Sequence, residues 1–342
     1  MKRINKYISH CASALLRTLS QASVPAALAL ALLLTLAFNS CHKVEIDPDL
    51  DGEYAIAFDE VTTKAIITDE TLESFKVWGE TEPGTANIFN GVEVTGSEKQ
   101  NNKYTKWSYY TNEEDAKYWE DNKTYNFFAV APSDLNLDYN ATNGYGVEYQ
   151  VPENMTADPV DMIVASAQRK TEQITDQPES VQLGFSHTLS KLQVQLKKAA
   201  TNEGQAITIK EVYLYGMKGD GVYFFNTGWS LGTDAATVYR TGLAVTLNGS
   251  YQGFGEFLMI PQDLLPDSIY LIVSFDYTSR DVTTPRVQIA PIPVDDDGVK
   301  KWEATKSYTY SAEISVDQDM IFETPSVENW ISNNEGGTII IK

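Results

Sequence analysis

The chain has 342 residues, of which 47 are acidic and 26 are basic, so its formal net charge is −21 and its pI is about 4.5. A surface of this charge repels phosphate backbones and anionic headgroups, which argues against nucleic acid and anionic lipid as partners. The two cysteines, Cys11 and Cys41, both fall in the first 41 residues, so the remainder is not expected to use disulfides, thiolate catalysis or cysteine metal ligands.

The first 40 residues have the pattern of a secretion signal. Four basic residues precede an apolar run over residues 24–38, which at about 15 residues is shorter than the roughly 20 that span a bilayer. The run ends at Phe38-Asn39-Ser40-Cys41, which resembles a lipobox except that Phe38 replaces the usual Leu. We predict a lipoprotein signal peptide over residues 1–40 and acyl chains on Cys41. The alternative is an ordinary cleaved signal that happens to contain a cysteine.

Residues 41–52 carry the acidic stretch HKVEIDPDLDGE directly after Cys41. Removal of the first 41 residues leaves 22 basic against 47 acidic residues, a net charge of −25. We interpret residues 41–52 as a solvated tether, and its acidic residues also resemble the surface-export signals of Bacteroidales lipoproteins. The predicted location is therefore the outer face of the outer membrane, reached through a lipid anchor.

The remaining chain shows the two-residue period of β-strands. Apolar and polar residues alternate over residues 191–197, and Tyr54, Ile56 and Phe58 alternate likewise. Residues 269–277 are apolar on both phases, which predicts a strand buried on both faces. The apolar phase changes between Ile209 and Val212, which predicts a bulge near residues 210–211.

One short helix is expected after Thr111, because Thr111 and Glu114 form a capping box ahead of Ala116 and Trp119. Elsewhere short strands alternate with turn residues, the pattern of β-sandwiches. A polar, proline-containing stretch over residues 168–180 divides the body. We predict an all-β protein with two tandem sandwiches, an N-terminal one over residues 53–177 and a C-terminal one over residues 178–342.

Several short segments, in this order and spacing, resemble the fimbrillin family, the lipoprotein pilins of Bacteroidales. They are Tyr54–Phe58 with Thr62-Thr63-Lys64-Ala65, Phe75–Gly79, Tyr125–Pro132, Leu183–Leu192, Tyr308–Tyr310 and Val327–Trp330. The resemblance implies two transthyretin-like sandwiches and assembly by strand exchange with other fimbrial subunits. In that family a protease cuts after the first strand, and a strand of the next subunit then fills the vacated place.

Two departures from the family bear on the role of this chain. The family's cut usually follows Arg, whereas the candidate site here is Lys64-Ala65. The last residues, Gly336–Lys342, are short for a donor strand and fit equally well the final strand of the second domain. We therefore interpret the chain as an accessory, tip or anchor subunit of a surface fimbria with a role in adhesion, in preference to a shaft pilin.

Enzyme chemistry has little support in the sequence, and no cofactor is expected. Outside the signal peptide the chain has two histidines, His42 and His187, and the serines beside His187 do not make a triad on a strand. A structural, hydrogen-bonded His187 is the preferred interpretation. No metal site is predicted, because Asp295–Gly298 lacks the spacing of a calcium loop and is interpreted as an acidic turn.

Aromatic residues suggest an alternative function. Trp107, Tyr109, Tyr110 and Trp119 fall in one neighbourhood, and flat aromatic rings stack on sugar rings. The alternative is therefore a surface lipoprotein that binds glycans for nutrient uptake. Against this, aromatic residues also fill β-sheet cores, which is the simpler interpretation of these four.

Overall fold

The computed structural model describes residues 54–63, 72–100, 103–155, 161–202, 204–294 and 299–330. These residues belong to one compact unit, Asp51–Lys342. The predicted signal peptide, Cys41 and the tether lie outside the described residues. Within the described residues, no helix has the length and apolar character needed to cross a membrane.

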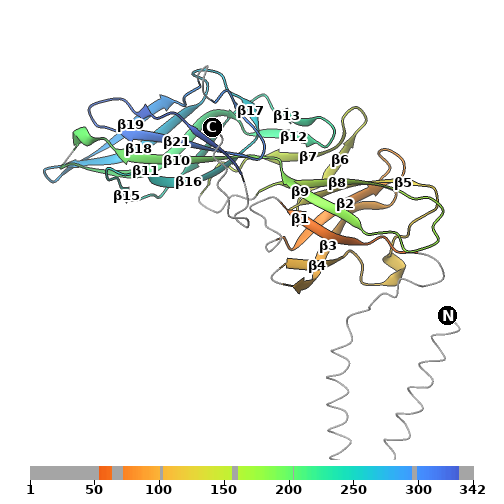
Figure 1. The fold of residues 1–342 in the computed structure, drawn as a ribbon. Helices are drawn as coiled ribbons and strands as arrows, with labels where there is room; N and C mark the ends of the chain where they lie inside the picture. Colours follow the sequence, from red (N-terminus) through yellow and green to blue (C-terminus); the bar gives the residue numbers. More distant parts are fainter. Residues whose placement is uncertain are drawn as a thin grey trace, which may run out of the picture. The chain divides into compact units, whose positions relative to one another are not determined.

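Strands make up nearly all regular structure, which confirms the all-β prediction (Figure 1). The described residues contain two single 3₁₀ turns, Glu113–Asp115 and Ala200–Asn202. The helix expected after Thr111 is thus only one turn long. Tyr118 forms a β-bridge with Ala55 instead, so tertiary pairing overrides the local capping signal.

Seven strands close into a barrel in the order β1-β4-β3-β2-β5-β8-β9. Their bounds are β1 (Phe58–Thr63), β2 (Ser74–Glu80), β3 (Phe89–Gln100), β4 (Lys103–Ser108), β5 (Thr124–Ala131), β8 (Ile163–Lys170) and β9 (Val181–His187). Strand β1 is antiparallel to β4 and parallel to β9, and it lies between them (Figure 1). The first strand, β1, therefore closes the barrel.

The barrel interior is largely aromatic and aliphatic, as expected where one face of every strand turns inward. Its buried members come from all seven strands and include Phe58, Phe75, Val77, Phe89, Val94, Trp107, Tyr125, Phe127, Ile163, Leu183 and Phe185. A second core cluster contains the buried residues of the C-terminal sheets.

The C-terminal part holds two larger sheets. One has the order β16-β10-β21-β22 with β23 also on β21, and the other β14-β11-β18-β19 with β15 also on β11. The first comprises β10 (Ser190–Lys198), β16 (Gln252–Met259), β21 (Lys306–Ile314), β22 (Ile321–Phe322) and β23 (Ser326–Asn329). The second comprises β11 (Ala206–Lys218), β14 (Ala235–Arg240), β15 (Val245–Thr246), β18 (Tyr270–Ser279) and β19 (Val282–Pro291).

Two small sheets complete the described strands. The order β13-β12-β7-β6 joins β6 (Leu137–Asn140), β7 (Gly144–Gln150), β12 (Asp220–Phe224) and β13 (Gly228–Leu231). The pair β17 (Gln262–Asp263) and β20 (Lys301–Trp302) forms the other.

Strand pairing crosses the predicted boundary after residue 177. That position falls in the loop between β8 and β9, and β9 pairs with β8 and β1 on the barrel side. Strand β7 pairs with β12, so residues from both sides of the boundary also share a sheet. The division into two domains at this position remains a prediction.

The alternation predicted for residues 191–197 is confirmed, because every second residue of β10 is buried. The predicted bulge is confirmed as well, since the pairing of β11 with β18 shifts between Ile209 and Glu211. The prediction for residues 269–277 was wrong on one point. Strand β18 buries only the face that carries Leu271, Val273 and Phe275, while Ile272 on the other face is partly exposed.

Candidate functional site around the first strand

The first-strand segment, residues 54–63, contains the first of the short segments that carry the sequence resemblance. The next described residue after this segment is Leu72, and β2 begins at Ser74. The predicted alternation holds, with Ile56 1% and Phe58 0% exposed, whereas Tyr54 is only partly buried. Two of the three side chains therefore lie fully inside the barrel.

Phe58 lies at the centre of an aromatic cluster. Its ring centroid is 5.6 Å from that of Phe89, 6.0 Å from those of Tyr109 and Phe127, and 6.2 Å from that of Phe75. Most of these contacts are edge-to-face, the favourable geometry for aromatic pairs. One residue of β1 thus contacts rings from β2, β3, β5 and the segment after β4.

The backbone of the first-strand segment pairs with two separate parts of the chain. The N–H of Ile56 donates to Lys117 O at 2.7 Å, and the N–H of Trp119 donates to Tyr54 O at 2.9 Å. On the other side the N–H of Val181 donates to Ala57 O at 2.8 Å. Strand β1 then continues in parallel beside β9 up to Thr63, with one shift in register.

The loop between β8 and β9 also contacts the first-strand segment. The hydroxyl of Tyr54 donates to Thr175 O at 3.2 Å, and the Gln177 side-chain amide donates to Ala55 O at 3.4 Å. Both bonds lie at the exposed end of the segment. These two bonds contribute little to the free energy of unfolding, but they hold the polar loop against the first residues of the segment.

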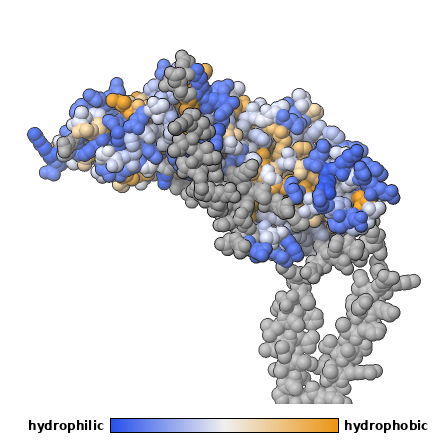
Figure 2. Space-filling view, in the orientation of Figure 1, coloured by the Kyte–Doolittle hydropathy of each residue, from blue (hydrophilic) through white to orange (hydrophobic). Residues whose placement is uncertain are grey.

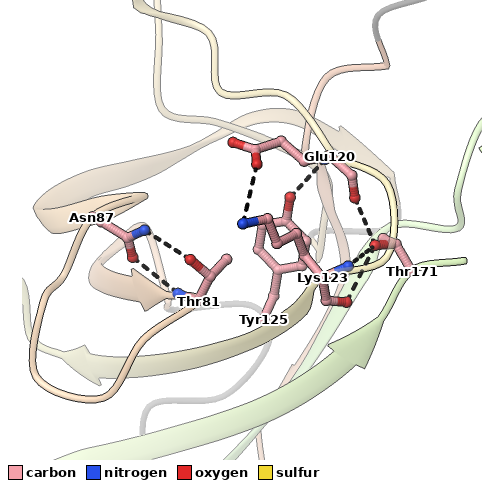
Figure 3. Close-up of polar contacts among 6 residues, drawn as sticks. All are labelled: Thr81, Asn87, Glu120, Lys123, Tyr125 and Thr171. Carbon is pink, nitrogen blue, oxygen red and sulfur yellow. Dashed lines mark hydrogen bonds and ion pairs between the residues drawn. The ribbon is translucent and has the colours of Figure 1, made fainter.

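Residues 117–119 pair with the start of the segment, and the loop that directly follows them is held by a polar network around Thr171 (Figure 3). Thr171 Oγ1 donates to Glu120 O at 2.6 Å and accepts the N–H of Lys123 at 2.9 Å. The N–H of Glu120 donates to the hydroxyl of Tyr125 at 2.6 Å. This loop is therefore fixed to β5 and to the end of β8.

Figure 3 shows a second polar pair in the turn between β2 and β3. The Asn87 side-chain amide donates to Thr81 Oγ1 at 2.8 Å, and its oxygen accepts the N–H of Thr81 at 2.9 Å.

Burial raises the pKa of Tyr125, so its hydroxyl stays neutral and remains the acceptor for the N–H of Glu120 in the network around Thr171. The loop after Trp119 is thus ordered by bonds that do not involve the first strand.

The four aromatic residues predicted to contact glycans lie around this site. Trp107 and Trp119 are 8% and 6% exposed, and their rings contact Phe75 and Tyr125 respectively. Tyr109 and Tyr110 are partly buried and contact each other at 4.6 Å. These contacts agree with the core-packing interpretation, and glycan contact remains a prediction.

Other predicted positions lie outside the described residues: Lys64, Ala65, Cys41, the acidic turn Asp295–Gly298 and the C-terminal segment Gly336–Lys342. His187 is buried, with its Nδ1 2.6 Å from Asp161 Oδ2 and its ring stacked on Trp330 at 3.8 Å. Ser190, one of its neighbours in sequence, donates to Glu303 O. This geometry agrees with a structural histidine.

Sequence reasoning missed the residues that receive the first strand. Lys117, Trp119 and Val181 are 61 to 124 residues from their partners, and no motif marks them. The helix expected after Thr111 assigned Trp119 to a helical face, so it gave no indication that Trp119 pairs with a strand. The polar, proline-containing composition of residues 168–180 correctly indicated a loop. Thr175 and Gln177 of that loop form hydrogen bonds with the first-strand segment.

Comparison with known proteins agrees with this geometry. The sequence pattern of the family described as fimbrillin-like matches residues 63–330. No curated protein sequence matches significantly. A fimbrial protein from Bacteroides vulgatus has a TM-score of 0.59 at 16% identity, covering 81% of this chain and 99% of that chain. A candidate cell adhesion protein from Bacteroides ovatus has a TM-score of 0.50 at 13% identity, covering 82% and 98%.

At these identities the solved structures show a shared fold. The family match is stronger, because it covers more than three quarters of the sequence and begins at the last residue of β1. The matched range also contains Lys117, Trp119 and Val181, which bond to the backbone of the first-strand segment. The chain belongs to the fimbrillin-like family.

Proposed function

We propose that this chain is a tip or anchor subunit of a cell-surface fimbria. An uncut copy is held at the outer membrane by lipid on Cys41, and a copy cut behind the first-strand segment is joined to other subunits by strand exchange at that segment. The observation that carries the proposal is that β1 closes the barrel between β4 and β9. Its loss would open both edges and expose the ring cluster around Phe58.

The energetics of the segment suit an exchangeable strand. Burial of Ile56 and Phe58 contributes about 1.5–3 kcal/mol each, or roughly 3–6 kcal/mol together. Ordering of the ten residues 54–63 costs about 1–2 kcal/mol per residue, so burial of these two side chains alone does not offset it. A strand that is covalently linked therefore stays in place, whereas a cleaved one could leave.

A strand from another subunit would recover the same interactions. It would fill the space of Phe58, accept the N–H groups of Trp119 and Val181, and donate to Lys117 O. This is β-augmentation at an edge that is open only after cleavage. The network around Thr171 holds the receiving loop while the place is empty.

The choice of a tip or anchor role depends on Lys64. A protease strictly specific for Arg would leave the bond to Ala65 intact, and the subunit would keep both β1 and its lipid. The glycan-binding alternative depended on Trp107, Tyr109, Tyr110 and Trp119. The two tryptophan rings lie in the core and the two tyrosines are partly buried, so the fimbrial proposal is better supported. An adhesive ligand would be bound elsewhere.

The experiment is limited proteolysis of the chain from Asp51 to Lys342, followed by addition of a synthetic peptide of residues 53–63. Trypsin should cut within residues 64–71, and the cut protein should bind the peptide and melt at a higher temperature with it. A peptide with F58S is the matched control and should not bind. If the cut protein keeps its melting temperature without peptide and ignores added peptide, strand exchange is refuted.

A further inference from the structure

Strand β19 has one free edge among the described strands, because it pairs with β18 alone. The N–H of Ile292 donates to Ile269 O, which fixes the phase of the antiparallel ladder. Hydrogen-bonded and non-hydrogen-bonded pairs alternate along such a ladder. The even-numbered residues of β19 therefore bond to β18, and the odd-numbered ones direct their N–H and C=O groups to the free edge.

Two prolines fit this phase. Pro285 and Pro291 are both odd-numbered, and a proline is tolerated where no N–H is needed for the neighbouring strand. Between them, Val287 and Ile289 are the residues whose N–H groups face the free edge. The edge thus offers two donors, bounded on each side by a residue without one.

The side chains at the same two positions are apolar and open to solvent. Val287 is 61% and Ile289 is 60% exposed, and Ile289 lies beside Ile272 of β18. Tyr213 of β11 extends the same row. Figure 2 shows hydrophobic residues among hydrophilic ones over the region of β18 and β19. Exposed edges usually carry charges that prevent pairing, yet the one charged residue between the two prolines is Arg286.

The spacing of these residues is symmetric about Gln288. We propose that β19 pairs antiparallel with β19 of a second copy of this chain, centred on Gln288. In this register Val287 lies opposite Ile289 of the second copy, and the four free N–H groups meet four C=O groups. Pro285 lies opposite Pro291, so the ladder ends where the donors end.

The register also places charge favourably. Arg286 lies opposite Ala290 of the second copy and not opposite its own counterpart, so like charges do not meet across the ladder. The apolar row of Tyr213, Ile272 and Ile289 continues across the junction. This contact is independent of the proposed strand exchange, because β19 and β1 belong to different sheets.

The net charge of the body sets the conditions for pairing. Two bodies of charge about −25 repel each other over roughly a Debye length, which is about 10 Å at 0.1 M salt. A contact held by four hydrogen bonds and one apolar row is weak against this repulsion. Dimerisation should therefore strengthen as salt is raised, the reverse of a contact held by ion pairs.

The test uses the chain from Asp51 to Lys342, which contains no cysteine. Sedimentation velocity at increasing protein and salt concentration should show a monomer and a dimer, with more dimer at high salt. Gln288 is partly buried and its side-chain amide donates to Ser315 O and Gln318 O, so Q288C removes these two bonds. Q288C should form a disulfide-linked dimer on mild oxidation, because the Cα atoms of the central non-hydrogen-bonded pair are about 4.5 Å apart. T284C, on the same face of β19 but displaced from the centre, is the matched control and should not.

Two further pairs of variants separate pairing from folding. V287P removes a donor from each copy without touching the β18 ladder, and should weaken the dimer about 30-fold. T283P makes the same change outside the pairing window and should have no effect. I289K should abolish the dimer, whereas V282K, at a residue 65% exposed outside the window, should not. A monomer at all salt concentrations, or equal cross-linking of Q288C and T284C, would overturn the proposal.

Discussion

Replacement of Phe58 by alanine is the most direct perturbation of the first-strand segment. The side chain is fully buried and contacts the rings of Phe75, Phe89, Tyr109 and Phe127. A Phe→Ala change in a well-packed core costs about 3–5 kcal/mol, from lost transfer energy and the cavity that remains. Because the cavity is lined by rigid rings from several strands, we expect the upper half of this range.

The measurement is urea-induced unfolding of the chain from Asp51 to Lys342, followed by tryptophan fluorescence and circular dichroism. V327A is the control, since Val327 is 46% exposed and its truncation should change the free energy of unfolding by less than about 0.5 kcal/mol. Susceptibility to trypsin should rise in parallel for F58A, because the strand is more easily released. A loss below about 1 kcal/mol for F58A would show that Phe58 does not fill the barrel core, and the strand-exchange proposal would lose its physical basis.

Three further predictions concern the network, pH and the lipid anchor. T171V should lower the free energy of unfolding by about 1–3 kcal/mol, because the Lys123 N–H loses its acceptor, whereas T171S should be near neutral in thermal unfolding. Burial raises the pKa of Tyr145 to about 12, above about 10 in the unfolded chain, so its contribution to stability should be lost as the pH rises between these values; Y145F should lack this loss in alkaline unfolding curves. C41A should abolish incorporation of labelled palmitate in cells, and continued labelling would refute the predicted lipobox.

The strands with a clear two-residue period could be predicted from the sequence. Residues 191–197 alternate because β10 has one face on the core, and the change of phase near residue 210 marks a bulge for the same reason. The first-strand segment was predicted on similar grounds through Ile56 and Phe58. In each case the sequence pattern reflects which face of a single strand is buried.

The pairing partners could not be predicted, because they depend on contacts between distant parts of the chain. Nothing in residues 54–63 indicates that β1 lies between β4 and β9, or that Trp119 bonds to Tyr54. The error over residues 269–277 has a related cause. Apolar residues on both phases predicted burial on both faces, whereas Ile272 belongs to a partly exposed row that continues to Ile289 at the sheet edge.

The position of β1 links anchoring to barrel closure under the proposed function. Cys41, the tether and the first-strand segment are consecutive, so one cut within residues 64–71 would free the body from its lipid and open the barrel at the same time. An uncut subunit is anchored and closed, and it cannot accept a strand. A cut subunit is open and must be held by a neighbour. The two states exclude each other, so the cut would decide whether a copy of this chain serves as an anchor or as an acceptor within the fimbria. The free edge of β19 is unaffected by this choice, and pairing through it should occur equally in both states.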